Sequence, residues 1–409
     1  MPNTQLEAAA PTEAKEYKMS NKPLEPAELI EAAEKLAPLL RAKAREAELA
    51  RKPLDEVIDA IRDSGIFALM VPKCYGGHEA DLDTFFEVAL TLSRADASMG
   101  WLVAFYMEHS YWFCGFPEEF QKEVFAERPY VLAPVTLNIT GGFAQEVEGG
   151  YRLSGQWSWG TGIIHAEWVL VGAMMAGADG TPAPIFFAVP RDEVEAIDTW
   201  YVSGMCSTGS FDIKIQDVFV PKSRTVAMMD LTNAVAAARL HDGPLYRTPL
   251  VPILGFASAL SMLGAAQGAL EEYQTQTKAK IASGQLRAGG TIKDEGKPSV
   301  VASAALTIDA AELLLRDVLR DVMEKRDSAS PEERGTWITR MAHAVFMCRS
   351  AVQDIVSVTG ASGSRLESPI QRALRDISTG SNHVIFDREA RYADYGRTLL
   401  GQPIQSIMV

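Results

Sequence analysis

Two tryptophans and a hydroxyl side chain stand close together in the stretch 157–162, which reads WSWGTG. Polar residues and glycines before it are typical of a β-hairpin, so we expect Trp157 and Trp159 to lie on one face of a strand, beside the hydroxyl of Thr161. An aromatic wall next to a hydroxyl suits a large planar ligand. A sheet whose tryptophans are core residues has the same spacing, and spacing alone leaves both interpretations open.

The histidines are the residues most able to move protons near neutral pH. His109 lies in an apolar helical pattern, where a histidine is more often a core residue than a functional one. Glu108 beside it is expected to point to another, solvated face of the helix. His383 lies near the C-terminus. We interpret three others as structural, namely His78, His241 and His343.

The elements that position these residues follow a helix–strand–helix order, which predicts an α+β protein. Residues 1–24 read as a flexible tail and 25–130 as an N-terminal helical domain. Short β-rich segments bounded by Gly, Pro or Asp predict a central β-barrel or sandwich domain over 131–240. Helical periodicity returns over 241–409, where we expect a four-helix bundle that also serves oligomerisation.

Composition narrows the classes of partner. The net charge of −14 argues against nucleic acid, and four scattered cysteines without a CxxC pair argue against a zinc site and favour a reducing cytoplasm. We expect no bound metal.

The uncharged stretch 249–270 is interrupted by Pro252, so it predicts a buried helix and not a membrane span, with Gly264 and Gly268 permitting close packing. The N-terminus lacks the apolar core of a signal peptide, and no dinucleotide fingerprint or phosphate loop is found.

Several landmarks then occur in order along the chain. They are Val71-Pro72 with Tyr75-Gly76-Gly77, Gly155 with Trp159-Gly160-Thr161, the run 207–212 followed by 218–221, and Gly360–Gly363 leading to Gln371-Arg372 and Arg375-Asp376. Together they resemble the acyl-CoA dehydrogenase superfamily over nearly the whole chain after the tail. The resemblance implies a homotetramer with flavin held between the β-domain and the C-terminal helices.

Acyl-CoA dehydrogenases need a carboxylate base. The position that carries it in most of them is Val384 here, and the alternative position falls in the stretch 250–263, which has no acid. Ordinary acyl-CoA dehydrogenation is therefore not expected.

The sequence is more similar to a side branch of that superfamily, the oxygenase components of two-component flavin monooxygenases such as the 4-hydroxyphenylacetate and phenol hydroxylases. Trp101 with His109, the stretch 159–162 with His165, and His383 carry this similarity. It implies that a separate reductase supplies reduced FMN or FAD by diffusion. Dioxygen then forms a C4a-hydroperoxyflavin, which hydroxylates a phenol- or indole-type ring in a dry pocket.

The same resemblance implies roles for individual residues. The Thr161 hydroxyl would meet flavin N5, His109 would accept the substrate proton, and His383 would hydrogen-bond the flavin or the peroxide. His165 would orient the flavin strand, and Arg372 with Arg375-Asp376 would form an ion pair at the subunit interface. The expected cofactor-binding residues are Trp101, Thr136, Trp159, Thr161, Gly162, Ser207, Thr208 and Ser210.

Two alternatives remain open at this stage. One is an acyl-CoA dehydrogenase-like flavin dehydrogenase or oxidase, and the other is a non-catalytic oligomer that has lost flavin. The sequence does not name the substrate, because the loops 136–145 and 222–248 carry no readable specificity pattern. The choice between FMN and FAD also stays open.

Overall fold

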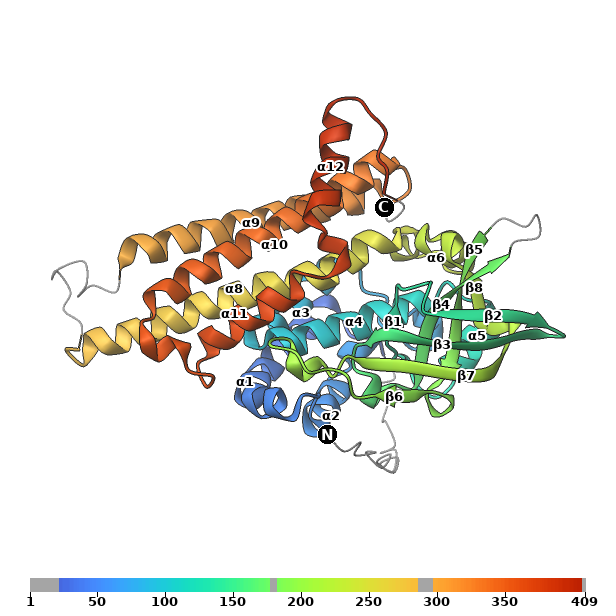
Figure 1. Cartoon of the computed structure of the whole chain (residues 1–409), viewed down its shortest axis with the longest axis horizontal. Helices are drawn as coiled ribbons and strands as arrows, with labels where there is room; N and C mark the ends of the chain where they lie inside the picture. The colour runs from blue at the N-terminus through green and yellow to red at the C-terminus, as the bar shows by residue number, and fades with distance from the viewer. Residues whose placement is uncertain (1–21, 177–181, 286–296, 407–409) are drawn as a thin grey trace.

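The computed structural model describes residues 22–176, 182–285 and 297–406. Most of the tail expected over residues 1–24 therefore lies outside the described residues. The described chain has a sheet at one end and a bundle of long helices at the other, with the N-terminal helices between and below them (Figure 1).

Amphipathic and apolar periodicity builds the N-terminal helices where the sequence predicts them. Asp81 and Asp96 begin two of these helices, each by accepting a backbone N–H with its side chain, Leu82 N for Asp81 and Met99 N for Asp96. The elements are α1 (Pro26–Ala50), α2 (Asp55–Asp63), η1 (Ile66–Ala68), η2 (Lys73–Tyr75), α3 (Leu82–Ala95), α4 (Ala97–Phe113) and α5 (Glu118–Val124).

The central segments form one eight-stranded sheet, with the order β6-β7-β3-β2-β4-β5-β8 and with β1 added beside β4. Most neighbours are antiparallel, and β3 pairs with β7 over nearly its whole length. The strands are β1 (Val135–Thr136), β2 (Gly142–Val147), β3 (Gly150–Gly160), β4 (Trp168–Ala176), β5 (Pro182–Pro190), β6 (Glu195–Ile197), β7 (Phe211–Pro221) and β8 (Thr225–Ala227). The 3-10 turns between them are η3 (Ile163–His165), η4 (Arg191–Glu193), η5 (Cys206–Thr208) and η6 (Lys222–Arg224).

The C-terminal part is helical, and α8 to α11 form the predicted bundle (Figure 1). Ser330 and Glu333 make a capping box at the start of α10. The elements are α6 (Met228–Thr232), α7 (Val235–Leu240), η7 (Pro244–Arg247), α8 (Leu250–Ala282), α9 (Pro298–Lys325), α10 (Pro331–Val358), η8 (Ala361–Ser364), α11 (Pro369–Gly380), η9 (Val384–Phe386) and α12 (Arg388–Leu399).

Helix α4 is the centre of the molecule. Each of its 17 residues is buried, so it has no solvent face. It packs on α3 and α8, and the Trp112 ring near its end meets Phe186 of β5 edge-on at 5.3 Å between centroids. Side chains on every side of α4 therefore face protein, and those that are polar need internal partners.

Helix α8 is the predicted buried helix. Both α8 and α9 are long and apolar enough to cross a membrane by length and composition alone, but 94% of the most apolar window of α8 is buried and only 22% of that of α9. A Cβ added at Gly264 would lie 2.5 Å from Ser93 Cβ, and one at Gly268 would lie 2.7 Å from the Arg94 carbonyl oxygen. These glycines bring α8 against α3, as the sequence predicts.

Candidate active site

Three side chains of α4 form a continuous row, because residues four apart share a helix face. The Trp101 and Phe105 rings stack at 4.8 Å between centroids, and Phe105 meets His109 edge-on at 5.2 Å. All three are almost fully buried. The row presents aromatic surface with an imidazole at one end.

His383 joins this row from the far end of the chain. Its ring meets Trp101 edge-on at 5.5 Å and Phe105 at 6.2 Å, and its Nδ1 accepts the Ile385 N–H at 3.4 Å. Burial lowers the pKa of His383 to about 4, so the imidazole is neutral at physiological pH. The fold thus brings both predicted active-site histidines to the same Phe105 ring.

The predicted flavin hydroxyls form a second cluster after β3. Thr161 Oγ1 lies 3.0 Å from Ser210 Oγ, which lies 2.8 Å from Thr208 Oγ1, and the Gly162 N–H donates to the Thr208 carbonyl at 2.9 Å. Ser207 is buried in the same turn, η5. The chain of hydroxyls leaves the half-buried Thr161 at its outer end.

Helix α4 contacts this hydroxyl cluster as well. The Tyr106 hydroxyl donates to the Gly162 carbonyl at 2.5 Å. Gly162 has a φ of +73°, and a Cβ there would lie 2.2 Å from the Tyr106 hydroxyl oxygen, so only glycine fits. A single rigid helix therefore positions the aromatic row and the turn that carries Thr161.

Thr136 is a predicted site residue with an unusual environment. It lies in β1 opposite Val171 of β4 and is 2% exposed. Its Oγ1 makes no hydrogen bond within the described part of the chain. Since buried hydroxyls are normally paired, this atom is consistent with a place for a ligand group.

The two tryptophans of β3 do not share a face, so that prediction was wrong. Trp157 is fully buried and donates its Nε1–H to the Gly172 carbonyl at 2.9 Å, whereas Trp159 is 60% exposed and meets Trp200 edge-on. The ladder with β7 shifts register between Trp157 and Gly160, and the extra residue reverses the alternation of side chains. Trp157 is a core residue, and only Trp159 is open to a ligand or another chain.

Glu108 was expected to be solvated, which is also wrong. It is fully buried, it accepts a hydrogen bond from Trp112 Nε1 with one carboxyl oxygen, and its other oxygen lies 3.3 Å from His109 Nε2. Desolvation raises the pKa of Glu108 to about 8, against the lowering effect of the Trp112 bond. The prediction failed because helical spacing shows only that Glu108 and His109 point in different directions. In α4 every direction is buried, so neither residue reaches solvent.

His109 is held at one ring nitrogen. Its Nδ1–H donates to the Ala133 carbonyl at 2.6 Å, which leaves Nε2 with the lone pair in the neutral ring. Burial lowers the pKa of His109 to about 3, although the hydrogen bond to Ala133 opposes this shift. The site therefore contains a neutral imidazole whose free nitrogen faces a carboxyl group.

Comparisons with known proteins agree with this arrangement. The acyl-CoA dehydrogenase N-terminal domain family matches residues 30–126, and the C-terminal domain family matches 256–388. A pigment production hydroxylase of Rhodococcus sp. is 34% identical over 92% of this chain and 97% of its own. The oxygenase component of an FADH(2)-dependent resorcinol hydroxylase of Rhizobium sp. is 33% identical over 90% of this chain and 92% of its own.

A solved structure gives the same picture. The 3-HSA hydroxylase from Rhodococcus sp. RHA1 is 28% identical, superposes with a TM-score of 0.88, and the match covers 93% of this chain and 99% of that one. The chain belongs to the acyl-CoA dehydrogenase superfamily, in its branch of flavin-dependent oxygenase components. Members of this branch are monooxygenases that take reduced flavin from a separate reductase.

The departure from acyl-CoA dehydrogenases is visible in the structure. Val384 in η9 is 54% exposed, and the first turns of α8 carry no acid. Glu108 is the carboxyl group that the structure adds to the site, and it comes from α4, at neither of the two base positions of the dehydrogenases.

The other predicted residues lie away from the aromatic row. His165 Nε2 lies 2.8 Å from Asp55 Oδ1 and so ties η3 to α2. The three histidines interpreted as structural each have a local partner, which is the Gly65 carbonyl for His78, Gln121 for His241 and Tyr392 for His343.

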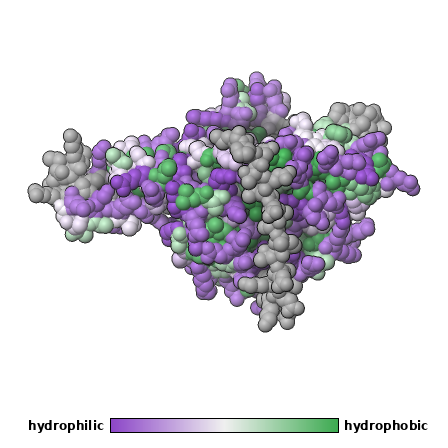
Figure 2. All heavy atoms as spheres, turned by 60° about the horizontal axis from the view of Figure 1, so that its bottom comes forward, coloured by the Kyte–Doolittle hydropathy of each residue, from purple (hydrophilic) through white to green (hydrophobic). Residues whose placement is uncertain are grey.

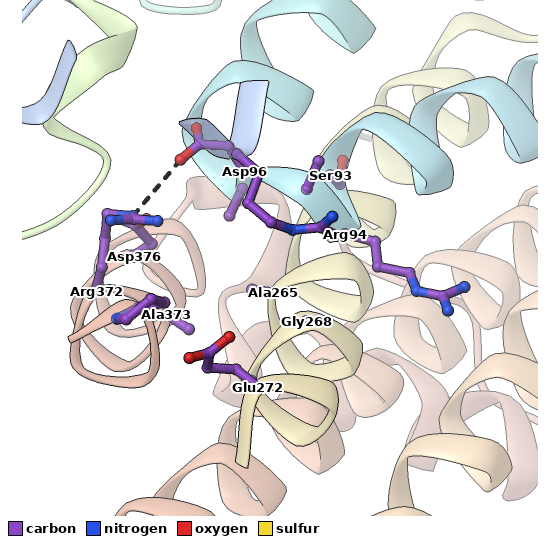
Figure 3. A pocket seen from close by; sticks show the side chains of 14 residues that line it. Ser93, Arg94, Asp96, Ala265, Gly268, Glu272, Arg372, Ala373 and Asp376 are labelled. Carbon is purple, nitrogen blue, oxygen red and sulfur yellow. Dashed lines mark ion pairs between the residues drawn. The ribbon is translucent and has the colours of Figure 1, made fainter. Parts of the chain in front are cut away.

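The arginines of α11 pair within the chain. Arg372 lies 3.6 Å from Asp96, Arg375 pairs with Glu48 of α1, and Asp376 accepts the Met205 N–H at 2.6 Å. The expected ion pair of Arg372 and of Arg375-Asp376 at a subunit interface stays a prediction, because these contacts lie within one chain. Figure 3 shows the charged cavity of about 70 Å³ beside these residues, with Arg372 directed at Asp96.

Proposed function

We propose that this chain hydroxylates an aromatic ring bearing an acidic O–H or N–H, using dioxygen and reduced FMN or FAD delivered by a separate reductase. The observation that carries the proposal is the Trp101–Phe105 stack with His109 and His383 at its edges. Flat aromatic surface suits a ring, and two neutral imidazoles offer hydrogen bonds to its polar substituent.

The residues present fit a bound flavin. We assign the flavin edge to Thr161 and the turn at Thr208 and Ser210, because their hydroxyls form one chain, and Thr136 supplies a further unpaired hydroxyl. When bound, reduced flavin supplies the activation of dioxygen. The protein's part is to orient the flavin, hold the substrate against the aromatic row and exclude water.

We assign separate tasks to the side chains. Thr161 contacts flavin N5, His109 takes part in removing the substrate proton, and His383 bonds to the flavin or the substrate. Trp101 forms a wall of the pocket, and the exposed Trp159 becomes covered when flavin or a neighbouring subunit binds. The relative named as FADH(2)-dependent and the XiaF structure in complex with FADH2 favour FAD as the first flavin to test.

We also propose a cytoplasmic homotetramer. Helix α9 exposes Leu306 at 70% and Leu313 at 68%, and large apolar side chains on an outer helix are typical of a subunit interface. The surface is otherwise largely polar with scattered apolar patches (Figure 2). Sedimentation velocity of the full chain tests the state, and Leu306→Glu with Leu313→Glu should dissociate it.

The test of the activity mixes the purified chain with chemically reduced FAD or FMN, oxygen and a panel of phenols and indoles. We expect hydroxylated product that requires reduced flavin. Product formation at the uncatalysed rate with every ring and both flavins would overturn the proposal. Bleaching of oxidised flavin by an acyl-CoA would favour the dehydrogenase alternative instead.

Two variants test the assignments. Thr161→Ala should leave oxygen consumption in place but divert a larger share of it to hydrogen peroxide, whereas Thr161→Ser should keep wild-type coupling because it keeps the hydroxyl. His109→Ala should slow hydroxylation by about 100-fold or more, as for loss of a general base. Coupling and rates equal to wild type in both alanine variants would contradict the assignments.

A further inference from the structure

The contact between Glu108 and His109 places a carboxyl oxygen that makes no hydrogen bond within the described residues beside the imidazole Nε2. The Ala133 carbonyl can only accept, so His109 Nδ1 carries the hydrogen of the neutral ring and Nε2 carries a lone pair. A carboxylate oxygen is also an acceptor, and it lies 3.3 Å from Nε2. Two buried acceptors at that distance repel each other unless one of the two groups carries a proton.

The surroundings of the pair decide where that proton rests. Glu108 is fully buried and His109 is 1% exposed. The buried half of α8 has no charged residue, and β5 contributes Phe186. The titratable groups that face the pair are Tyr111 on α4, whose hydroxyl donates to the Thr248 carbonyl, and His383 of the η9 turn, across the Phe105 ring.

No lysine or arginine among the described residues forms an ion pair with this carboxyl group, and its nearest titratable neighbour is the neutral His109. Desolvation raises the pKa of Glu108 to about 8 and lowers that of His109 to about 3. The proton therefore rests on the Glu108 carboxyl, whose Oε2 lies 3.3 Å from Nε2 and makes no hydrogen bond within the described residues. An imidazole with so low a pKa is by itself a poor acceptor for a phenol proton, since a phenol has a pKa of about 10.

We propose that Glu108 is the final acceptor of the substrate's ring proton and acts through His109. The inference rests on the proposed function. The substrate O–H bond breaks, its proton passes to Nε2 and then to the Glu108 carboxylate, and a carboxylic O–H bond forms. The imidazole ends neutral, the ring becomes an anion, and the negative charge of the site moves from Glu108 to the substrate without being lost. Glu108 touches no substrate atom in this scheme and is a positioning residue that sets the protonation of His109.

The pair works as a base only after it has lost its proton to solvent. Hydroxylation limited by this proton transfer should therefore rise with pH and level off near pH 8. An isolated histidine with a lowered pKa would instead give a rate that no longer changes between pH 6 and 9.

The experiment measures single-turnover hydroxylation by the intact protein, with reduced FAD and saturating phenol, from pH 6 to 9. The test variant is Glu108→Gln, which keeps the side chain's shape and its acceptor for Trp112 but does not take up a proton. We expect the wild-type rate to rise about tenfold per pH unit below pH 8. The variant should be slower by about 100-fold at pH 8 and independent of pH.

The matched control is Glu87→Gln, because Glu87 pairs with Arg316 between α3 and α9 at a partly exposed site. It should keep the wild-type rate and pH profile. A Glu108→Gln variant with the wild-type pH profile would overturn the inference. If His109→Ala is impaired in the same assay, the proposed function still stands; if it is not, the base assignment to His109 fails first.

A second measurement needs no turnover and no variant enzyme activity. Phenol absorbs differently as neutral phenol and as phenolate, and its pKa of about 10 keeps it neutral in solution between pH 8 and 9, so its spectrum reports its protonation when it is bound to the flavin-loaded wild type. We expect binding between pH 8 and 9 to yield phenolate together with a new carboxylic acid band in the infrared difference spectrum. Binding as the neutral phenol, with no change in carboxyl absorption, would contradict the inference even if Glu108→Gln does not fold.

Discussion

The two ends of α4 hold two buried acids in opposite surroundings. Asp96 precedes the helix, accepts the Met99 N–H at 2.8 Å, and faces the Arg372 guanidinium. Glu108 lies near the other end and faces only the Trp112 N–H and a neutral imidazole. Burial raises the pKa of both carboxyl groups, but only Asp96 has a permanent cation to oppose that shift.

The two surroundings give the two acids different roles, one structural and one chemical. An acid paired with arginine and a helix N-terminus stays ionised and orders the backbone around it. An acid without a cation gains and loses a proton near physiological pH, which is the property a general base needs. The following changes would break or sharpen this comparison.

The largest effect is expected at Asp96, at the start of α4. Asp96→Ala leaves Arg372 without its buried partner and removes the helix cap, so the free energy of unfolding should fall by about 3–5 kcal/mol. Asp96→Asn keeps a cap and should lose less. Denaturant titration of the full chain at fixed concentration measures both, and equal losses for the two variants would show that the charge is irrelevant.

A smaller effect is expected from Trp112→Phe at the other end. It removes the N–H that stabilises the Glu108 carboxylate, which should cost about 1–3 kcal/mol of stability. It should also raise the pKa of Glu108 further and move the rising part of the pH–rate profile to higher pH. Trp337→Phe in α10, which makes a similar buried cavity, should leave the profile in place.

The effect that is smallest per pH unit is the pH dependence of the free energy of unfolding. The pKa of Glu108 is raised in the folded state, so the folded chain binds its proton more tightly than the unfolded chain does. Stability should therefore fall as pH rises from about 4, the ordinary value, towards about 8. Glu108→Gln should weaken this dependence by about 1 kcal/mol per pH unit. An unchanged slope in denaturation measured between pH 5 and 8 would show that Glu108 does not hold its proton.

The sequence predicts the helices and strands well because their periodicity is local, as in α3, α4 and the capped start of α10. The resemblance to flavin oxygenases brings Thr161, His109 and His383 into one hypothesis, and the structure shows the two histidines at the same aromatic ring. Their meeting could not be read from spacing, because 274 positions separate them.

Glu108 was missed for a physical reason. A helix in a small layer has an inner and an outer face, but α4 is surrounded, so any polar residue in it is buried wherever it points. The available signal was composition, since Glu108 is the one acid in an otherwise apolar helix of 17 residues. The two tryptophans of β3 were misplaced because a bulge leaves no mark in an alternating pattern.

The close contact of α8 with α3 at Gly264 and Gly268 limits how this protein can be re-engineered. Because α8 approaches the backbone of α3 closely there, any larger side chain at these two glycines would push α3 and the adjoining α4 away from α8. A directed-evolution library that varies the bundle would shift the aromatic row and the Glu108–His109 pair together. The segments 136–145 and 222–248, expected to be loops, include parts of β1 and β2 in the first and the elements β8, α6 and α7 in the second. New substrate range should therefore come from the turns between these elements, where side chains can vary while the contact between α8 and α3 stays in place.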